Sequence, residues 1–442
     1  MFLRILAITS YLAFVTIVSG CRCPSGGCVP RTPTMPCVLE PAEVIGQQPD
    51  LTALSDTSEE LVPLPSPQET YHLLSVGTCQ CSAATNAPLA NMVELERHWA
   101  RVVIECDTDA VGKNYRLERD LLALRATEIR NESAASALEA YYQLAGLETQ
   151  QHFLQLATEE TERTLGRIKN LQEQEITVPD GVDYGAIEAR LHELKDQRLQ
   201  LEFLRIQLNG QLQKLIGCPL DENIFYWPQV EWQVDPEPVD VESALAVGLA
   251  TRSDLRGLQL LLCKMDKITL PVVRAVLSYA DGTIGSVEPR DGLIHVARCF
   301  HCNKTEVPVR CKQLSLFYTH TENLAIAQIK GAAYKIVLQQ QRVANSQQAV
   351  ETFRSRVDEL TKARQVENVT IFEISKARGD LYQAESDLIK QVVALEVAKV
   401  DLRKSQGTLA LECGFEPCLC CEGCCDGACC CRNKKRCSCK RK

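Results

Sequence analysis

The chain has 442 residues, of which 45% are hydrophobic, 24% are charged and 5% are aromatic, with a formal net charge of -9. These values are those of a folded protein, and the scarcity of aromatic residues beside abundant Leu, Ala, Gln and Glu favours helix over sheet. No basic stretch with interleaved aromatic residues occurs, which argues against nucleic-acid recognition.

The N-terminus has the pattern of an export signal. Arg4 precedes an apolar stretch from Ile5 to Val18, which is too short for a confident membrane-spanning helix, and small residues follow. Residues 1–20 are therefore predicted to be a signal peptide. The run Val18-Ser19-Gly20-Cys21 also has the pattern of a bacterial lipobox, so Cys21 is either a lipid anchor or a cysteine that follows an ordinary signal by coincidence.

Export places the cysteines in an oxidising compartment, where thiols pair or bind metal. We expect most of the twelve cysteines before residue 413 to form disulfides, whose connectivity the sequence does not give. Cys299 and Cys302, with Cys311 after them, have the spacing of zinc ligands, but without a second C-x2-C pair a disulfide-stabilised loop is the preferred interpretation.

Residues 21–70 are predicted to be a tether, because nine of the nineteen prolines fall between residues 24 and 68. A short helix is then expected from Pro88 to Val103. Beyond it, apolar and small residues recur every seven positions, which is the pattern of long packed helices. The clearest seams are Ile329, Ile336, Val343, Val350 and Val357, and then Ile374, Leu381, Leu388, Leu395, Leu402 and Leu409.

A polar stretch, ARQVENVTIFEIS, separates these two seams, so they form an antiparallel hairpin with arms of roughly 40 residues, about 60 Å long. The same plan occurs earlier, with Ala140, Leu147, Leu154, Thr161 and Ile168 before the turn and Ile187, Leu194, Leu201, Leu208 and Leu215 after it. Each return arm is expected to close on a glycine, in QLQKLIGCPL and TLALECGFEP. The chain is thus a duplication, with repeats at residues 71–220 and 221–412.

Periodicity leaves the packing of these hairpins open. They form either a four-helix bundle within one chain or a set that packs sideways on neighbours, including those of other subunits.

The hairpins, their order and the export signal resemble the TolC family of outer-membrane efflux proteins. Thr370, Ile371, Phe372, Glu373, Ile374 and Ala377 match that family's second hairpin, and LATRSDLR at residues 249–256 resembles the motif that opens its second repeat. The resemblance covers residues 120–220 and 240–415. One departure is that residues 98–113 are too short for the two transmembrane strands that the family has in each repeat, and residues 270–320 carry many charges and turns.

The resemblance implies a mainly α fold of two tandem hairpins, and a homotrimer whose six hairpins form a tapering helical barrel at the outer membrane and in the periplasm. It also implies that the hairpin tips meet a periplasmic adaptor of a system that includes an inner-membrane pump. The residues at these tips would be Glu175, Ile176, Val178 and Pro179, and Glu367, Asn368, Val369 and Thr370.

The last thirty residues form a basic tail with eleven of the 23 cysteines. Clustered thiolates bind soft ions such as Cu(I) or Zn(II), and nearby lysines and arginines favour the thiolate. Metal binding, disulfides within or between subunits, and an inert extension stay open for this tail. The candidate ligands are Cys418, Cys420, Cys421, Cys424, Cys425, Cys429, Cys430, Cys431, Cys437 and Cys439.

No nucleophile motif, phosphate loop or paired carboxylates occur at a credible spacing, so we expect no enzyme and no other cofactor. The expected function is a passive conduit in an efflux or type I secretion system. The alternative is a non-conducting coiled-coil scaffold or a metal-sequestering periplasmic lipoprotein.

Overall fold

The computed structural model describes residues 70–106, 110–174, 184–220, 224–230, 232, 239–284, 286, 296–364 and 370–417. These residues are mainly helical, as the sequence predicts. In the first repeat the elements are β1 (Thr70–Ser75), α1 (Val76–Asn86), α2 (Pro88–Cys106), α3 (Ala110–Glu173) and α4 (Tyr184–Ile216). In the second they are β2 (Ile224–Gln229), α5 (Val241–Thr251), α6 (Ser253–Cys263), α7 (Leu270–Ala280), α8 (Val296–Ala363), α9 (Ile371–Gln406) and α10 (Leu409–Glu412).

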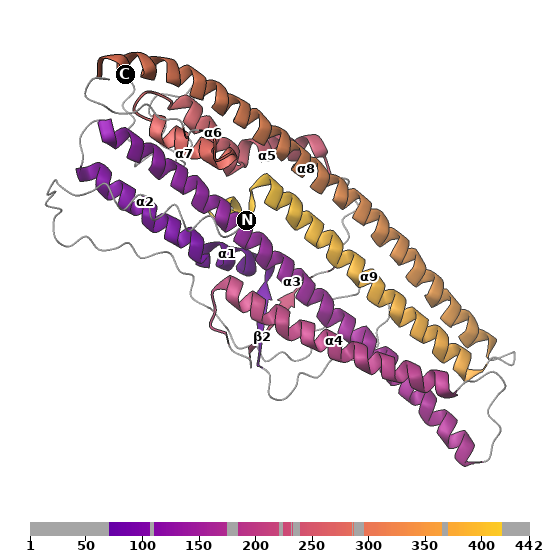
Figure 1. The fold of residues 1–442 in the computed structure, drawn as a ribbon. Helices are drawn as coiled ribbons and strands as arrows, with labels where there is room; N and C mark the ends of the chain where they lie inside the picture. The colour runs from indigo at the N-terminus through magenta and orange to yellow at the C-terminus, as the bar shows by residue number, and fades with distance from the viewer. Residues whose placement is uncertain are drawn as a thin grey trace.

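The long helices lie side by side in a single layer, in the order α4, α3, α9, α8 (Figure 1). Within the described residues, α4 and α8 lie at opposite edges and do not pack on each other. The four seams therefore do not close into a four-helix bundle. At the other end of the molecule α2 lies on the α4 edge, and α6 and α7 fill the place of α9 between α3 and α8.

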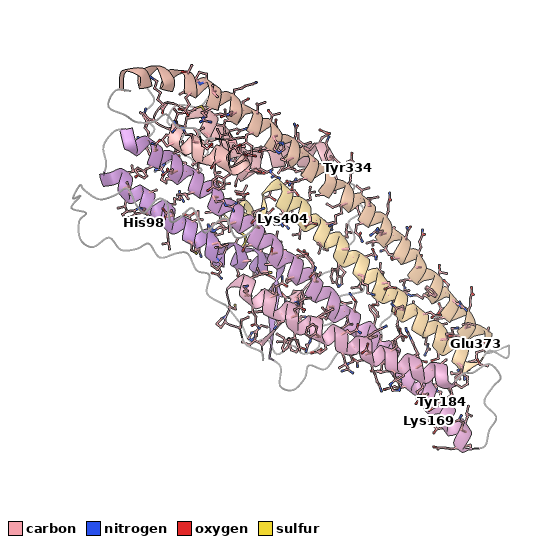
Figure 2. The ribbon with its side chains drawn as sticks, in the orientation of Figure 1. His98, Lys169, Tyr184, Tyr334, Glu373 and Lys404 are labelled. Atoms are coloured by element: carbon pink, nitrogen blue, oxygen red, sulfur yellow. A yellow bond between two sulfur atoms is a disulfide. The ribbon has the colours of Figure 1, made fainter. Side chains whose placement is uncertain are left out.

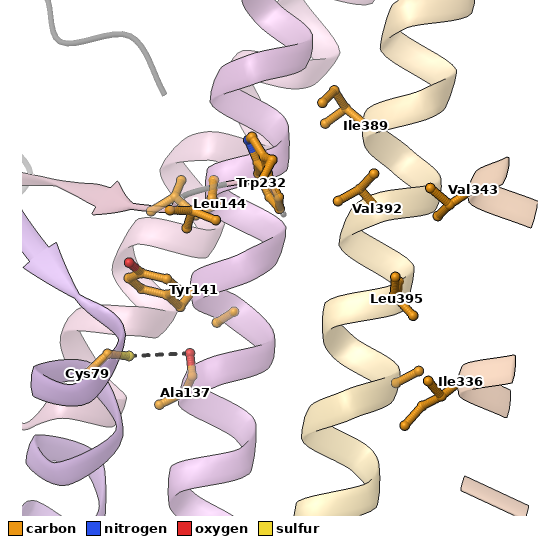
Figure 3. Close-up of a cluster of buried hydrophobic side chains, with 14 of the residues drawn as sticks. Cys79, Ala137, Tyr141, Leu144, Trp232, Ile336, Val343, Ile389, Val392 and Leu395 are labelled. Atoms are coloured by element: carbon orange, nitrogen blue, oxygen red, sulfur yellow. Dashed lines mark hydrogen bonds between the residues drawn. The ribbon is translucent and has the colours of Figure 1, made fainter. Parts of the chain in front are cut away.

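The predicted seams of the second hairpin form the core of this layer. Ile329, Ile336, Val343 and Val350 of α8 are buried, as are all six seam residues from Ile374 to Leu409. Figure 3 shows Ile336 and Val343 facing Val392 and Leu395 of α9, with Tyr141 and Leu144 on the neighbouring α3. The sequence thus placed these helix contacts correctly, because a seven-residue repeat of apolar side chains must be covered by another helix.

The outbound arms are longer than the predicted forty residues, since α3 has 64 and α8 has 68. Each continues past the end of its return arm and changes partner, α3 to α2 and α8 to α6 and α7. Residues 270–280 and 296–320 are helical. Cys299 and Cys302 lie on the second of these helices, so the loop expected around them is wrong. Cys311, on the same helix, has a free and exposed thiol.

The duplication is visible where the return arms end. The eleven-residue helices α1 and α5 are each separated from the next helix by one residue, Ala87 and Arg252. α4 and α9 end beside these breaks, on Gly217 and Gly407, whose φ angles of 80° and 77° are left-handed. The second arm therefore ends at Gly407, ahead of the predicted TLALECGFEP, which forms α10 and a further left-handed glycine, Gly414.

A small parallel sheet joins the two repeats, with Thr70 to Ser75 of β1 paired in register with Ile224 to Gln229 of β2. The buried hydroxyl of Tyr141 on α3 lies 3.0 Å from the Leu74 carbonyl oxygen and 2.8 Å from that of Gln229. One side chain of the long helix therefore holds the ends of both strands. Only these two strands occur in the part of the chain that the structure describes.

Candidate functional site

Most of the predicted site residues lie outside the described residues. These are the lipidation candidate Cys21, the tip residues Glu175, Ile176, Val178, Pro179, Glu367, Asn368 and Val369, and the ten tail cysteines from Cys418 to Cys439. Thr370 is the exception. The described ends of both hairpins lie at one end of the molecule, where Figure 2 labels Lys169, Tyr184 and Glu373.

Thr370 begins α9 through a capping box. Its hydroxyl accepts a hydrogen bond from the Glu373 amide at 3.3 Å, and the Glu373 carboxylate accepts one from the Thr370 amide at 2.9 Å. Both side chains satisfy amides that the first turn of a helix leaves without partners. The structural role of Thr370 is therefore to fix where the return arm starts.

Behind the tips, a buried polar cluster joins the two hairpins. Ser375 of α9 donates a hydrogen bond to the Glu160 carboxylate at 2.7 Å, and its hydroxyl lies 2.5 Å from that of Thr164 on α3. Arg163 and Arg378 lie 3.7 and 3.8 Å from the same carboxylate. Because a buried carboxylate is costly without partners, this cluster fixes the α3–α9 pairing at the tip end. The sequence alone gives no sign of this cluster.

The two edges of the layer both expose apolar side chains. On α4 these are Leu199, Phe203 and Ile206, of which Leu199 and Phe203 are 69% and 67% exposed. They project away from Leu194 and Leu212, which pack on α3. Spacings of three and four residues place such side chains on one face of a helix, so α4 has an apolar stripe opposite its core face.

The same edge continues along α2, where Leu89, Met92, Leu95 and Trp99 are exposed at helical spacing. The opposite edge is α8, which exposes Val309, Leu316, Tyr334 and Leu338 along its length. Tyr334 and Leu338 lie on the side of α8 opposite Ile336 and Val343. We call these two surfaces the α2/α4 edge and the α8 edge.

The two broad faces of the layer differ. α1 and α10 cover one of them, where Ala84, Ala134, Leu138 and Leu409 form a buried cluster. Glu132 lies two residues from Ala134, about 200° round α3, and is exposed. On α9, Gln383, Asp387 and Lys390 are exposed as well. The face away from α1 and α10 is therefore polar, and we call it the uncovered face.

The two ends of the described chain meet on the covered face. A disulfide joins Cys81 of α1 to Cys413, which follows α10. Gln80 donates to the Leu409 carbonyl oxygen at 2.9 Å and to Glu412 at 2.8 Å, and Arg403 pairs with Glu412. Cys413 thus belongs to the folded body. Cys218 is also disulfide-bonded.

Phe415 continues this contact by packing under the guanidinium of Arg130, whose Cζ lies 4.4 Å from the ring centroid. Arg130 is 2% exposed and donates to Asn91 on α2 at 3.0 Å. Cys79, close to the disulfide in sequence, stays a thiol, donates to the Ala137 carbonyl oxygen at 3.6 Å, and has its pKa raised to about 12 by burial. Cys79 and the disulfide between Cys81 and Cys413 therefore have structural roles.

No helix in the described part of the chain combines the length and the apolar character that crossing a bilayer requires. Within the same residues no group of three or more metal-ligating side chains comes together.

Solved structures with this arrangement of helices are outer-membrane channels. The Campylobacter jejuni CmeC channel matches with a TM-score of 0.55 and 12% identity, over 75% of this chain and 85% of that one. The open state of the Neisseria gonorrhoeae MtrE channel matches with a TM-score of 0.55 and 11% identity, over 75% of this chain and 88% of that one. CusC matches with 0.56 and 11% identity, over 80% and 99%.

The chain has the TolC-family fold. No family model and no curated protein matches its sequence. At identities of 11% and 12% the likeness establishes the TolC-like architecture of tandem hairpins, which confirms the predicted fold.

Proposed function

We propose that this chain is one protomer of a trimeric, TolC-like duct at the outer membrane, which serves an efflux or type I secretion system as a passive conduit. The observation that carries the proposal is the pair of apolar edges on a single layer of helices. A layer has two open edges, and other copies of the same layer would bury them.

Contact between the α2/α4 edge of one copy and the α8 edge of the next is heterologous, because each copy contributes a different surface. Heterologous contacts produce rings when the rotation between copies closes. Each copy has two hairpins, so three copies give the six hairpins that the TolC-like fold implies. In such a ring the uncovered face lines the lumen, and its polar side chains suit an aqueous path.

The partners follow from the same fold. The hairpin tips are the docking surface for a periplasmic adaptor, and an inner-membrane pump supplies the energy, so the duct itself carries out no reaction. The signal in residues 1–20 exports the chain, and a lipid on Cys21 attaches its N-terminus to the membrane.

The test is to purify the full-length, acylated protein in detergent, measure its mass by light scattering and record conductance in planar bilayers. A trimer that conducts is expected. A protein that stays monomeric and gives no conductance would contradict the proposal and leave the non-conducting coiled-coil scaffold as the better function.

A second candidate function, metal sequestration, is favoured by the density of cysteines between Cys418 and Cys439. We expect the full-length protein to retain Cu(I) or Zn(II) and a chain truncated after Pro417 to lose it. The truncation keeps Cys413 and Phe415, so the folded body is preserved. Equal metal content in the two proteins, measured by atomic emission after dialysis, would exclude this role.

A further inference from the structure

A polar cavity of about 580 Å³ lies in the layer where α9 ends and α6 begins. α3, α8, α9 and the break between α5 and α6 all contribute to its walls, and the residues that matter here are Glu128, Glu132, Arg252, Gly331, Lys404 and Gly407. Glu132 is on the uncovered face, so the cavity opens away from α1 and α10.

In the first repeat the corresponding place, where α4 ends beside the break between α1 and α2, is filled by side chains. There Asn86 donates to the Ile216 carbonyl oxygen at 2.6 Å, and a Cβ on Gly217 would lie 2.5 Å from the Asn86 Cβ. In the second repeat a Cβ on Gly407 would find its nearest neighbour at 3.5 Å, and one on Gly331 would meet nothing within 4 Å. The end of α4 is therefore closely packed against the break between α1 and α2, whereas the end of α9 leaves an open space beside the break between α5 and α6.

Most charges around the cavity are already paired. Arg252 binds Asp254 at 2.7 Å and donates to the Ser405 carbonyl oxygen at 2.9 Å, which ties the start of α6 to the end of α9. Lys335 pairs with Asp401 at 2.7 Å. Glu128 pairs with Arg125 at 2.7 Å. These charges therefore already have partners within the protein.

Two charges are left over. The Glu132 carboxylate and the Lys404 ammonium line the cavity and make no hydrogen bond or salt bridge among the described residues, although Arg125 interacts electrostatically with Glu132. Their helices are close, because the Asn131 side chain donates to the Lys404 carbonyl oxygen at 3.0 Å. The cavity thus presents one negative and one positive group without a salt-bridge partner, and the only apolar side chain among its lining residues is that of Ala332.

We propose that this cavity binds a small zwitterion, between an amino acid and a tripeptide in size, with its amino group on Glu132 and its carboxylate on Lys404. The volume is within the range of small-molecule sites, and the charged and polar side chains of the lining favour a polar ligand. A ligand with one positive and one negative group is best complemented by a protein site that places a negative group against the first and a positive group against the second.

The experiment measures binding of glycine, diglycine and triglycine to the full-length protein by calorimetry, at concentrations up to about 10 mM. At least one of these zwitterions should bind saturably. Its N-acetylated form and its C-terminal amide should each bind at least tenfold more weakly, because each lacks one of the two charges.

Gly331→Leu is the sharpest variant, since Gly331 is part of the cavity wall and a Cβ there meets nothing within 4 Å. It should abolish binding while the circular dichroism spectrum and melting temperature are preserved. Glu132→Gln and Lys404→Gln should each weaken binding at least tenfold. Lys390→Gln, on the same uncovered face of α9 but outside the cavity, is the matched control.

Saturation by none of the three zwitterions would overturn the proposal, and so would binding that Gly331→Leu leaves unchanged. None of these measurements depends on ring formation or conductance, so the site and the proposed duct can fail separately.

Discussion

Gly146 is a residue at which two helices approach closely. A Cβ at this position of α3 would lie 2.2 Å from Cγ2 of Val393 on α9, a distance that no real packing allows. The glycine therefore permits the close contact between the two hairpins of the chain.

We expect Gly146→Ala to destabilise the protein by about 1–3 kcal/mol, the usual cost of overpacking a buried contact. Chemical denaturation measures it. Gly166→Ala, on the same helix with open space around its Cβ, should be neutral or stabilise by up to ~1 kcal/mol. Adding Val393→Ala should restore much of the loss, and equal effects of the two glycine substitutions would show that α3 and α9 are not in close contact.

At the scale of elements, α7 is held on α8 by a shared carboxylate. Arg274 of α7 donates two hydrogen bonds of 2.7 Å to Glu306 of α8, and Arg310 donates a third at 3.0 Å. The hydrogen bonds from Arg274 hold the pKa of Glu306 below its usual value, although burial opposes them.

Because the folded pKa is the lower one, this carboxylate stabilises the fold above its unfolded pKa, about 4.3, and the contribution is lost as the pH falls through the folded value. Wild type should therefore exceed Glu306→Gln in unfolding free energy at pH 7, and the difference should shrink below about pH 4. Glu351→Gln, exposed on α8, is the control. A difference that is constant with pH would contradict the assignment.

The whole molecule is closed by the disulfide between Cys81 and Cys413, which are 332 residues apart in sequence. Cross-linking so long a loop restricts the unfolded chain, and removing a native disulfide typically costs about 2–5 kcal/mol. We expect the Cys81→Ser, Cys413→Ser double variant to melt at a lower temperature than wild type under oxidising conditions.

Reductant should bring the melting temperatures of the two proteins close together, and any remaining sensitivity of the variant belongs to other disulfides, that of Cys218 among them. Equal melting temperatures before reduction would mean that the bond contributes nothing to the folded body.

At the same scale, the apolar edges predict which substitutions prevent ring formation. Phe203→Glu on α4 and Leu338→Glu on α8 place a carboxylate in the proposed contact, where an unpaired charge is costly to bury. Each should weaken self-association at least tenfold by analytical ultracentrifugation. Lys390→Glu, on the uncovered face, should leave the association unchanged, and rings that persist in both edge variants would exclude these edges as the interface.

The sequence predicts the hairpins well because a heptad is local information, as the buried Ile336, Val343, Leu388 and Leu395 demonstrate. The heptad prediction fails where α3 and α8 extend beyond their return arms. There each helix packs on different partners, and the seven-residue repeat of the hairpin no longer applies. The capping box of Thr370 and Glu373 was readable from its T-x-x-E spacing.

The contacts that join distant parts were not readable. Nothing near Cys81 indicates Cys413 as its partner, and Ser375 gives no sign that it meets Glu160 on another hairpin. The cavity depends on the absence of side chains at Gly331 and Gly407, and on which helix ends meet there. Such features arise from tertiary placement, which periodicity does not encode.

The bond between Cys81 and Cys413 also determines how the protein responds to cutting. A single proteolytic cleavage anywhere between these residues, for instance between α3 and α4, would leave two fragments linked covalently. A nicked chain would therefore migrate as two pieces only after reduction, and its halves could not drift apart in an oxidising compartment. The fold thus tolerates breaks at its most distant turns.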